Sequence, residues 1–242
     1  MVKNILVTGA SRGIGKKIAS ELKLEGYNVF LSSKNVDLLE KISGEILADG
    51  FIASDLSSPV DLENLAKFIK EKSIDILINN AGEYIYGNIE NMTYAQISKI
   101  YATNLLAPAY LCSSAVNSMK VKKWGRIINI GSISGIMGEA YASTYSASKS
   151  GLIGLTKALA LELAEYNITV NVINPGWVET EMGLKSIEQS EFSIKETIET
   201  IPQKRFVQPQ EIEKLIEYLI SNDAKGITGQ SINLCAGLSL GI

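Results

Sequence analysis

A phenol and an ammonium group lie four residues apart in the sequence, at Tyr145 and Lys149. On a helix this spacing places both side chains on one face, about one turn apart. An isolated tyrosine has a pKa of about 10, and a neighbouring ammonium stabilises the phenolate and lowers that pKa. The pair is therefore a candidate general acid for a carbonyl oxygen, and a general base for the reverse step. An ordinary amphipathic helix surface is the alternative explanation.

The chain contains no histidine. Its composition therefore excludes Ser-His-Asp and Cys-His nucleophilic sites and the usual catalytic zinc ligands. The two cysteines, Cys112 and Cys235, lie far apart and outside any C-x-x-C spacing. We expect both to be buried thiols, and we predict no metal site.

A glycine-rich turn, TGASRGIG, follows the first apolar stretch of the chain. Glycines permit a tight turn there and let backbone N–H groups at the start of a helix approach a pyrophosphate. A plain helix-starting turn is the alternative. The candidate dinucleotide contacts in this turn are Gly9, Ser11, Arg12, Gly13, Ile14 and Gly15.

The end of the second apolar stretch distinguishes NAD from NADP. An acidic residue there would bind the ribose 2′-hydroxyl group, whereas a basic residue would bind a 2′-phosphate. The chain has Ser33 and Lys34 at this point, and the first carboxylate comes only at Asp37. Lys34 and Arg12 can both donate charge-assisted hydrogen bonds to a phosphate. We therefore predict NADP(H) as the preferred cofactor and NAD(H) as the alternative; a solvated loop lysine is the other explanation for Lys34.

Short apolar runs alternate with segments of helical period, which is typical of right-handed strand-helix-strand units. The expected strands are Asn4 to Val7, Asn28 to Leu31, Phe51 to Ala53, Ile74 to Ile78, Arg126 to Ile130, Thr169 to Ile173 and Ser231 to Leu234. The expected helices are Ile14 to Leu24, Val36 to Leu47, Val60 to Glu71, Tyr145 to Tyr166 and Pro209 to Ile220, and helical stretches are expected to cover Tyr94 to Met119.

This order of elements predicts an α/β fold. We expect one doubly wound Rossmann domain over residues 1–242, with a mostly parallel seven-stranded sheet. Ligands of such sheets bind beyond the carboxyl ends of the strands. The stretch from Trp177 to Val207 shows no clear pattern, and we expect it to be irregular and to act as a substrate lid.

Taken in order, the motifs resemble the short-chain dehydrogenase/reductase superfamily. The glycine turn, the Asn-Asn-Ala-Gly run that ends at Gly82, the Tyr145 and Lys149 pair and the Asn-Pro-Gly run that ends at Gly176 follow the superfamily's order over nearly the whole chain. The resemblance implies an oxidoreductase that moves hydride between a nicotinamide and a carbonyl or alcohol.

The resemblance also implies roles for particular residues. Ser132 would bind the substrate oxygen, with Ser134 as the close competitor, and Asn104 would hold a water-mediated proton relay from Lys149. The catalytic set is then Asn104, Ser132, Tyr145 and Lys149. Further cofactor contacts are expected at Asp55, Leu56, Asn80, Ala81, Gly82, Tyr145, Lys149, Pro175, Gly176, Val178 and Thr180.

Within the superfamily, the segment from Lys123 to Ser132 is most similar to the 3-oxoacyl-(acyl-carrier-protein) reductases. In those enzymes basic residues dock the acidic carrier protein, and Lys122 and Lys123 match one such position. Glu165 and Tyr166 stand where a second basic residue is usual, which removes an attractive charge. We predict reduction of a 3-oxoacyl thioester or similar ketone, with acyl carrier protein as a candidate partner.

Two other functions stay open. One is a dehydrogenase or reductase for a free small ketone or alcohol in a specialised pathway, and the other is a non-catalytic nucleotide-binding scaffold. Residues expected to flank the substrate pocket, or to serve only in packing, are Glu83, Tyr84, Tyr86, Glu139, Tyr141, Met182 and Leu184.

The chain carries 26 acidic and 23 basic residues and has no long basic run, so nucleic acid and anionic membranes are poor candidate partners. Residues 151–163 are too short and too charged to span a bilayer, and the N-terminus lacks a secretory pattern. We therefore expect a cytoplasmic protein. The resemblance implies a homotetramer, and an apolar face fits either a subunit interface or packing on the sheet. That face consists of Leu152, Leu155, Leu159 and Leu163.

Overall fold

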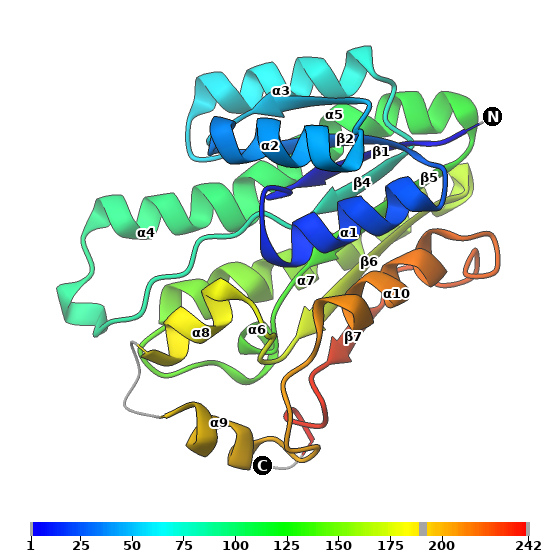
Figure 1. Ribbon diagram of the computed structural model, residues 1–242. Helices are drawn as coiled ribbons and strands as arrows, with labels where there is room; N and C mark the ends of the chain where they lie inside the picture. Colours follow the sequence, from blue (N-terminus) through cyan, green and yellow to red (C-terminus); the bar gives the residue numbers. More distant parts are fainter. Residues whose placement is uncertain (1, 189–192, 241–242) are drawn as a thin grey trace.

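The computed structural model describes residues 2–188 and 193–240, without the side chain of Met182 (Figure 1). Its centre is a seven-stranded sheet in the order β3-β2-β1-β4-β5-β6-β7. All six strand pairs are parallel. The strands are β1 Asn4–Thr8, β2 Asn28–Ser33, β3 Gly50–Ala53, β4 Ile76–Asn79, β5 Gly125–Ile130, β6 Ile168–Pro175 and β7 Ser231–Leu234. The predicted doubly wound sheet is thus confirmed, and it is parallel throughout.

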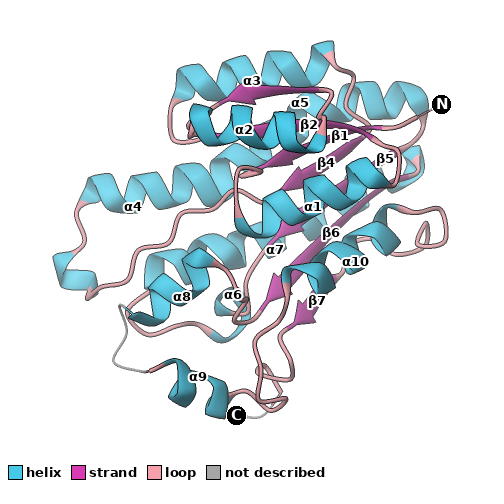
Figure 2. Ribbon diagram, in the orientation of Figure 1, coloured by secondary structure: helices cyan, strands magenta, loops and turns pink. Residues whose placement is uncertain are grey.

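Helices cover both faces of the sheet, as Figure 2 shows. They are α1 Gly13–Leu24, α2 Val36–Ile46, α3 Pro59–Glu71, α4 Tyr94–Tyr101, α5 Ala107–Lys122, α6 Ser134–Met137, α7 Ser143–Leu163, α8 Glu181–Glu188, α9 Ile194–Thr200 and α10 Pro209–Ile220. Along β1, Ile5 and Val7 belong to the core formed with α1, α2 and α10. Leu6 belongs to the opposite core, with α3, α5 and α7. Strands buried on both faces explain the continuous apolar runs in the sequence.

The helical stretches predicted from Tyr94 to Met119 are two helices in the structure, α4 and α5. A π-helical turn, Ala102–Leu106, joins α4 to α5. Pro108 lies in the first turn of α5 and has no N–H to donate to the carbonyl of Asn104, so the regular bonding pattern cannot continue through this point. Such turns are frequent at functional sites.

The stretch from Trp177 to Val207 contains two helices, so the prediction of an irregular segment was wrong. Thr180 accepts a hydrogen bond from the N–H of Gly183 in the first turn of α8. Ser193 begins α9 with a capping box that it forms with Glu196. Both ends of the stretch are joined where Val178 pairs with Val207. Of the predicted lid, residues 189–192 lie outside the described part, and the closing role remains a prediction.

Two further expectations concern burial. Cys112 and Cys235 are free and buried, as predicted. Leu159 and Leu163 pack into the core under α7, which favours the sheet-packing explanation for that apolar face.

Within the described residues, no helix is both long and apolar enough to cross a membrane.

Candidate active site

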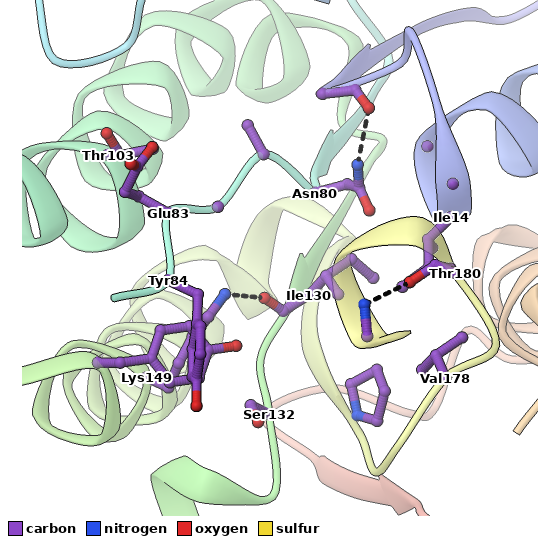
Figure 3. Close-up of a pocket in the computed structure, with 18 of the residues that line it drawn as sticks. Ile14, Asn80, Glu83, Tyr84, Thr103, Ile130, Ser132, Lys149, Val178 and Thr180 are labelled. Atoms are coloured by element: carbon purple, nitrogen blue, oxygen red, sulfur yellow. Dashed lines mark hydrogen bonds between the residues drawn. The ribbon is translucent and has the colours of Figure 1, made fainter. Parts of the chain in front are cut away.

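A cavity of about 530 Å³ opens where β1, β2, β4, β5 and β6 end. Its lining includes the last residues of four strands and the residue that follows β4. These are Thr8 of β1, Ser33 of β2, Ile130 of β5, Pro175 of β6, and Asn80. The carboxyl edge of a doubly wound sheet is the expected ligand site. Residues from the predicted cofactor site and from the predicted catalytic site therefore share one cavity (Figure 3).

The glycine turn forms one wall of this cavity and leads into α1. Gly9 and Gly13 have φ angles of +65° and +54°, a region that favours glycine. A Cβ atom on Gly15 would lie 2.3 Å from the Gly9 carbonyl oxygen and 2.5 Å from the Asn80 side-chain nitrogen. The absence of a side chain at Gly15 thus lets the first turn of α1 pack closely against Gly9 and Asn80. A pyrophosphate fits such a helix start.

The end of β4 is fixed against the end of β1. The Asn80 side chain donates to the carbonyl oxygen of Thr8 at 2.8 Å, as Figure 3 shows. The hydroxyl of Thr8 accepts from the backbone N–H groups of Asn80 and Ala81, each at 3.0 Å. These bonds hold Ala81 and Gly82 along the cavity wall.

Two cations stand at the end of the cavity beside β2. Lys34 pairs with Asp55 at 2.5 Å, and Arg12 pairs with Glu181 at 3.5 Å. The hydrogen bond from Lys34 is the main cause that lowers the pKa of Asp55 to about 2. Ser11 and Ser33 form a hydroxyl pair at 2.8 Å in the same region. This end of the site can hold a phosphate dianion, provided that the cations exchange their carboxylate partners for it.

The catalytic candidates lie deeper in the cavity. Tyr145 and Lys149 are one turn apart on α7, and the Lys149 Nζ is 5.7 Å from the centre of the Tyr145 ring. That Nζ also donates to the carbonyl oxygen of Ile130 at 2.7 Å, the bond drawn in Figure 3. Ser132 follows β5 and lines the cavity with Tyr145. The structure thus brings Ser132, Tyr145 and Lys149 together.

The expected lowering of the Tyr145 pKa is wrong. Burial raises the pKa of Tyr145 to about 12, the Glu139 carboxylate adds to this rise, and only the hydrogen bond with Ser132 acts against it. Burial also lowers the pKa of Lys149 to about 8. Desolvation exceeds the charge effect here, since Lys149 is buried and Tyr145 is half-buried in the cavity wall.

Asn104 is 1% exposed and sits behind the cavity wall. Its Oδ1 accepts from the backbone N–H of Glu83 at 2.8 Å, and its Nδ2 donates to the Glu83 carbonyl oxygen at 2.9 Å and to Ser148 at 3.1 Å. A Cβ atom on Gly82 would lie 3.6 Å from the Asn104 Oδ1 and 3.7 Å from the Lys149 Nζ. Asn104 therefore fixes the loop after β4, next to the lysine, and its relay role remains a prediction.

Residues after β6 form the wall nearest α8. Pro175, Gly176, Val178 and Thr180 all line the cavity, as does Leu56 on the opposite side. The N–H of Gly176 donates to Leu234 at 3.0 Å, which ties this wall to β7. The predicted cofactor residues in this segment thus face the same space as the glycine turn.

Comparison with known proteins identifies the family. The sequence model of a family described as enoyl-(acyl carrier protein) reductase matches residues 9–239. The chain belongs to this family of short-chain dehydrogenases/reductases. A 3-oxoacyl-(acyl-carrier-protein) reductase of Buchnera aphidicola is 38% identical over 239 residues, covering 98% of this chain and 97% of the relative. A D-beta-hydroxybutyrate dehydrogenase of Rhizobium meliloti is 33% identical over 254 residues, covering 98% of each.

Two solved structures support the same assignment. A single-residue variant of the actinorhodin polyketide ketoreductase with NADPH is 34% identical, has a TM-score of 0.94 and matches over 99% of this chain and 98% of the other. YwfH, an NADPH-dependent reductase involved in bacilysin biosynthesis, is 28% identical, with a TM-score of 0.93 and full coverage of both chains. These neighbours agree with the fold and with the NADP(H) preference predicted from Lys34 and Arg12.

This reductase has a hydrogen-bonded network that the sequence did not predict. Ser132 donates to Ser134 at 3.0 Å, and Ser134 donates to Glu139 at 2.6 Å. Tyr84 donates to the other oxygen of Glu139 at 2.7 Å, and its ring lies edge-on to that of Tyr145 with centroids 5.0 Å apart. The sequence pointed only to a pocket-flanking position for Tyr84 and Glu139. No spacing signal connects residues from segments so far apart.

Only some of the residues expected to flank the substrate pocket line the cavity. Glu83, Tyr84 and Glu139 line the cavity, whereas Tyr86, Tyr141 and Leu184 do not belong to its lining. The side chain of Met182 lies outside the described residues. Lining residues that the sequence did not suggest include Lys99, Met137 and Leu238. In the described part of the chain, no cluster of Cys, Asp or Glu side chains has the arrangement of a metal site.

Proposed function

We propose that this NADP(H)-dependent oxidoreductase reduces the ketone of a 3-oxoacyl thioester, or of a similar 3-oxo compound, to the 3-hydroxy compound. The observation that carries the proposal is the single cavity that joins the glycine turn and Lys34 to Ser132, Tyr145 and Lys149. Cofactor residues and a proton donor on adjoining walls are what a hydride transfer to a carbonyl requires.

The residues present fit a nicotinamide dinucleotide phosphate. The glycine turn at the start of α1 lines the cavity and suits a pyrophosphate, and Lys34 and Arg12 suit a 2′-phosphate. Lys149 would hold the nicotinamide ribose. When bound, the reduced nicotinamide supplies the hydride that the carbonyl carbon receives.

Tyr145 supplies the proton in this mechanism. With its pKa raised to about 12 by burial, the hydroxyl is protonated at neutral pH and holds the proton that the carbonyl oxygen needs. The hydroxyl proton passes to the carbonyl oxygen as the carbon gains hydride, which leaves an alcohol and a phenolate. The positive charge of Lys149, 5.7 Å from the Tyr145 ring centre, stabilises that phenolate. Ser132 holds the carbonyl oxygen near the hydroxyl.

The carrier of the acyl group is the less supported part. Lys122 and Lys123 lie just before the first residue of β5, at the opposite edge of the sheet from the cavity. Lys122 is also engaged, since it pairs with Asp75 at 2.8 Å and donates to the Ser73 carbonyl oxygen. This observation favours a coenzyme A thioester or a free ketone as the second candidate, beside the acyl-carrier-protein thioester.

The assembly proposed from the resemblance is a homotetramer through α5 and α7. Leu161 on α7 is 85% exposed and Val121 on α5 is 87% exposed in the isolated chain. Burial of these apolar side chains between subunits would supply a driving force. Light scattering of the purified protein tests this, and a monomer at micromolar concentration contradicts it.

The test of the function is an initial-rate assay of reduced nicotinamide oxidation. NADPH and NADH are compared with acetoacetyl thioesters of coenzyme A and of acyl carrier protein, and with simple neutral ketones. We expect NADPH-dependent turnover that needs a ketone. Preference for the carrier-protein thioester identifies the carrier, whereas preference for free ketones moves the function to the second candidate. A protein that binds NADPH but reduces none of them contradicts the proposal and favours the scaffold.

A further inference from the structure

Glu139 lies in the short loop between α6 and α7, at the substrate end of the cavity. Each of its carboxylate oxygens accepts one hydrogen bond, from Tyr84 at 2.7 Å and from Ser134 at 2.6 Å. The two donors come from separate segments, the loop after β4 and the start of α6. The carboxylate is therefore held in place, and each oxygen keeps a second lone pair free for a ligand.

Glu139 differs from the other carboxylates in the cavity lining because it has no cationic partner among the described residues. Asp55 pairs with Lys34, Glu83 pairs with Lys99, and Glu181 pairs with Arg12 and Lys185. No lysine or arginine of the described residues, 2–188 and 193–240, lies within ion-pair distance of the Glu139 carboxylate. Its two partners are neutral hydroxyl groups, which leave a net negative charge.

This charge lies beside the reacting groups. Ser134 connects Glu139 to Ser132 through two hydrogen bonds, of 2.6 Å and 3.0 Å. Tyr84 connects it to Tyr145 through an edge-on ring contact with centroids 5.0 Å apart. Among the described residues, Lys149 forms no ion pair with Glu139, and its Nζ donates to the Ile130 carbonyl oxygen. A carbonyl placed between Ser132 and Tyr145 would have the carboxylate close to its substituents.

We propose that Glu139 determines substrate specificity: it excludes ketones that carry a carboxylate near the carbonyl, and it binds neutral or positively charged ketones that present a hydrogen-bond donor. A second carboxylate placed within a few ångströms of Glu139 would be repelled by its charge. A hydroxyl, amide N–H or ammonium group would instead meet an acceptor that is already oriented. The inference rests on the proposed ketone reduction and names its substrate class.

The experiment compares three small 3-oxo compounds of similar size. They are the acetoacetate anion, the neutral acetoacetamide and the cationic 4-aminobutan-2-one, each assayed with NADPH for wild type and for Glu139→Gln. The amide keeps the size of the side chain and removes its charge. Glu90→Gln is the matched control, because Glu90 is exposed in the 3-10 turn Ile89–Asn91 and lies outside the cavity lining.

We expect Glu139→Gln to raise kcat/KM for acetoacetate relative to acetoacetamide by at least about tenfold, and to lower it for the cation. Glu90→Gln should leave all three ratios at the wild-type values. An acetoacetate to acetoacetamide ratio that changes less than twofold in Glu139→Gln overturns the inference, while turnover of any ketone leaves the proposed function standing.

Equilibrium binding provides a measurement that does not need turnover. The affinities of acetoacetate and acetoacetamide for the NADP⁺ complex are measured by calorimetry for the same three proteins. A selective gain in acetoacetate affinity in Glu139→Gln supports the inference even if no ketone is reduced. A failure to reduce any ketone would contradict only the proposed reaction. Equal affinities for both compounds in wild type overturn it.

Discussion

The Nζ of Lys149 lies 2.7 Å from the carbonyl oxygen of Ile130, so that α7 is anchored to the last residue of β5. Lys149 is 3% exposed, and burial lowers its pKa to about 8. The same bond that holds the ammonium group beside Tyr145 therefore fixes it in a site that disfavours its charge.

The contribution of Lys149 to the stability of the protein should rise with pH above about 8. Between about 8 and the usual lysine pKa of 10.5, Lys149 loses its proton in the folded state and keeps it in the unfolded state. The unfolded state binds more protons at this site, so the Lys149 contribution to the free energy of unfolding increases with pH, by up to about 3 kcal/mol. Burial raises the pKa of the Cys112 thiol to about 12 and acts in the opposite sense at alkaline pH, so the quantity to compare is the difference between wild type and Lys149→Met. Urea unfolding from pH 7 to 10 measures this. Lys149→Met should remove the rise, whereas Lys157→Met, exposed on the same helix, should keep it.

Tyr145→Phe should lower kcat for ketone reduction by about a thousandfold, because the proton donor is lost. The affinity for NADPH, measured by fluorescence, should change less than threefold. Tyr94→Phe is the control, since Tyr94 is 86% exposed and distant from the cavity lining. Residual turnover above about a tenth of the wild-type rate would show that another group donates the proton.

The two ion pairs at the β2 end of the cavity should set the cofactor preference. Lys34→Ala removes a cation for the 2′-phosphate, so the Kd for NADPH should rise at least about tenfold while that for NADH changes little. Glu181→Gln releases Arg12 from its 3.5 Å partner and should tighten NADPH binding severalfold. Titrations of both cofactors measure these shifts. If NADH and NADPH weaken equally in Lys34→Ala, the lysine does not contact the phosphate.

Two glycines offer a contrast between a constrained and a free position. Gly15→Ala would place its Cβ 2.3 Å from the Gly9 carbonyl oxygen. We therefore expect the free energy of unfolding to fall by at least about 2 kcal/mol, and NADPH binding to weaken as well. Gly44→Ala meets nothing within 4 Å in α2 and should stabilise the protein by about 0.5 to 1 kcal/mol. Thermal unfolding compares them, and equal effects would disprove the steric argument.

Much of the fold was predictable because its strands are buried on both faces. Apolar runs such as Asn28 to Leu31 and Thr169 to Ile173 lie within observed strands, and the glycine turn lies between a strand and a helix as expected. These features depend on local composition. A helix and a strand read directly from periodicity need no knowledge of their distant neighbours.

The features that the sequence did not predict depend on tertiary contacts. The π-helical turn at Ala102–Leu106 follows from how Pro108 interrupts a helix that is packed at both ends. The sign of the Tyr145 pKa shift follows from burial, which the Tyr145 and Lys149 spacing cannot show. The Glu139 network needs a loop after β4 to meet a loop after α6. The capping box at Ser193 is different, since its sequence signal was present.

The strand order also has a consequence for synthesis on the ribosome. Residues up to Gly82 contain β1 to β4 together with the glycine turn and Lys34, so the cofactor half emerges before Ser132 and Tyr145 are translated. Until β5 follows, β4 is the open edge of a growing parallel sheet with four buried side chains. Unpaired apolar edges attract other chains. We therefore expect the nascent protein to be most prone to aggregation, and most dependent on chaperones, during this interval.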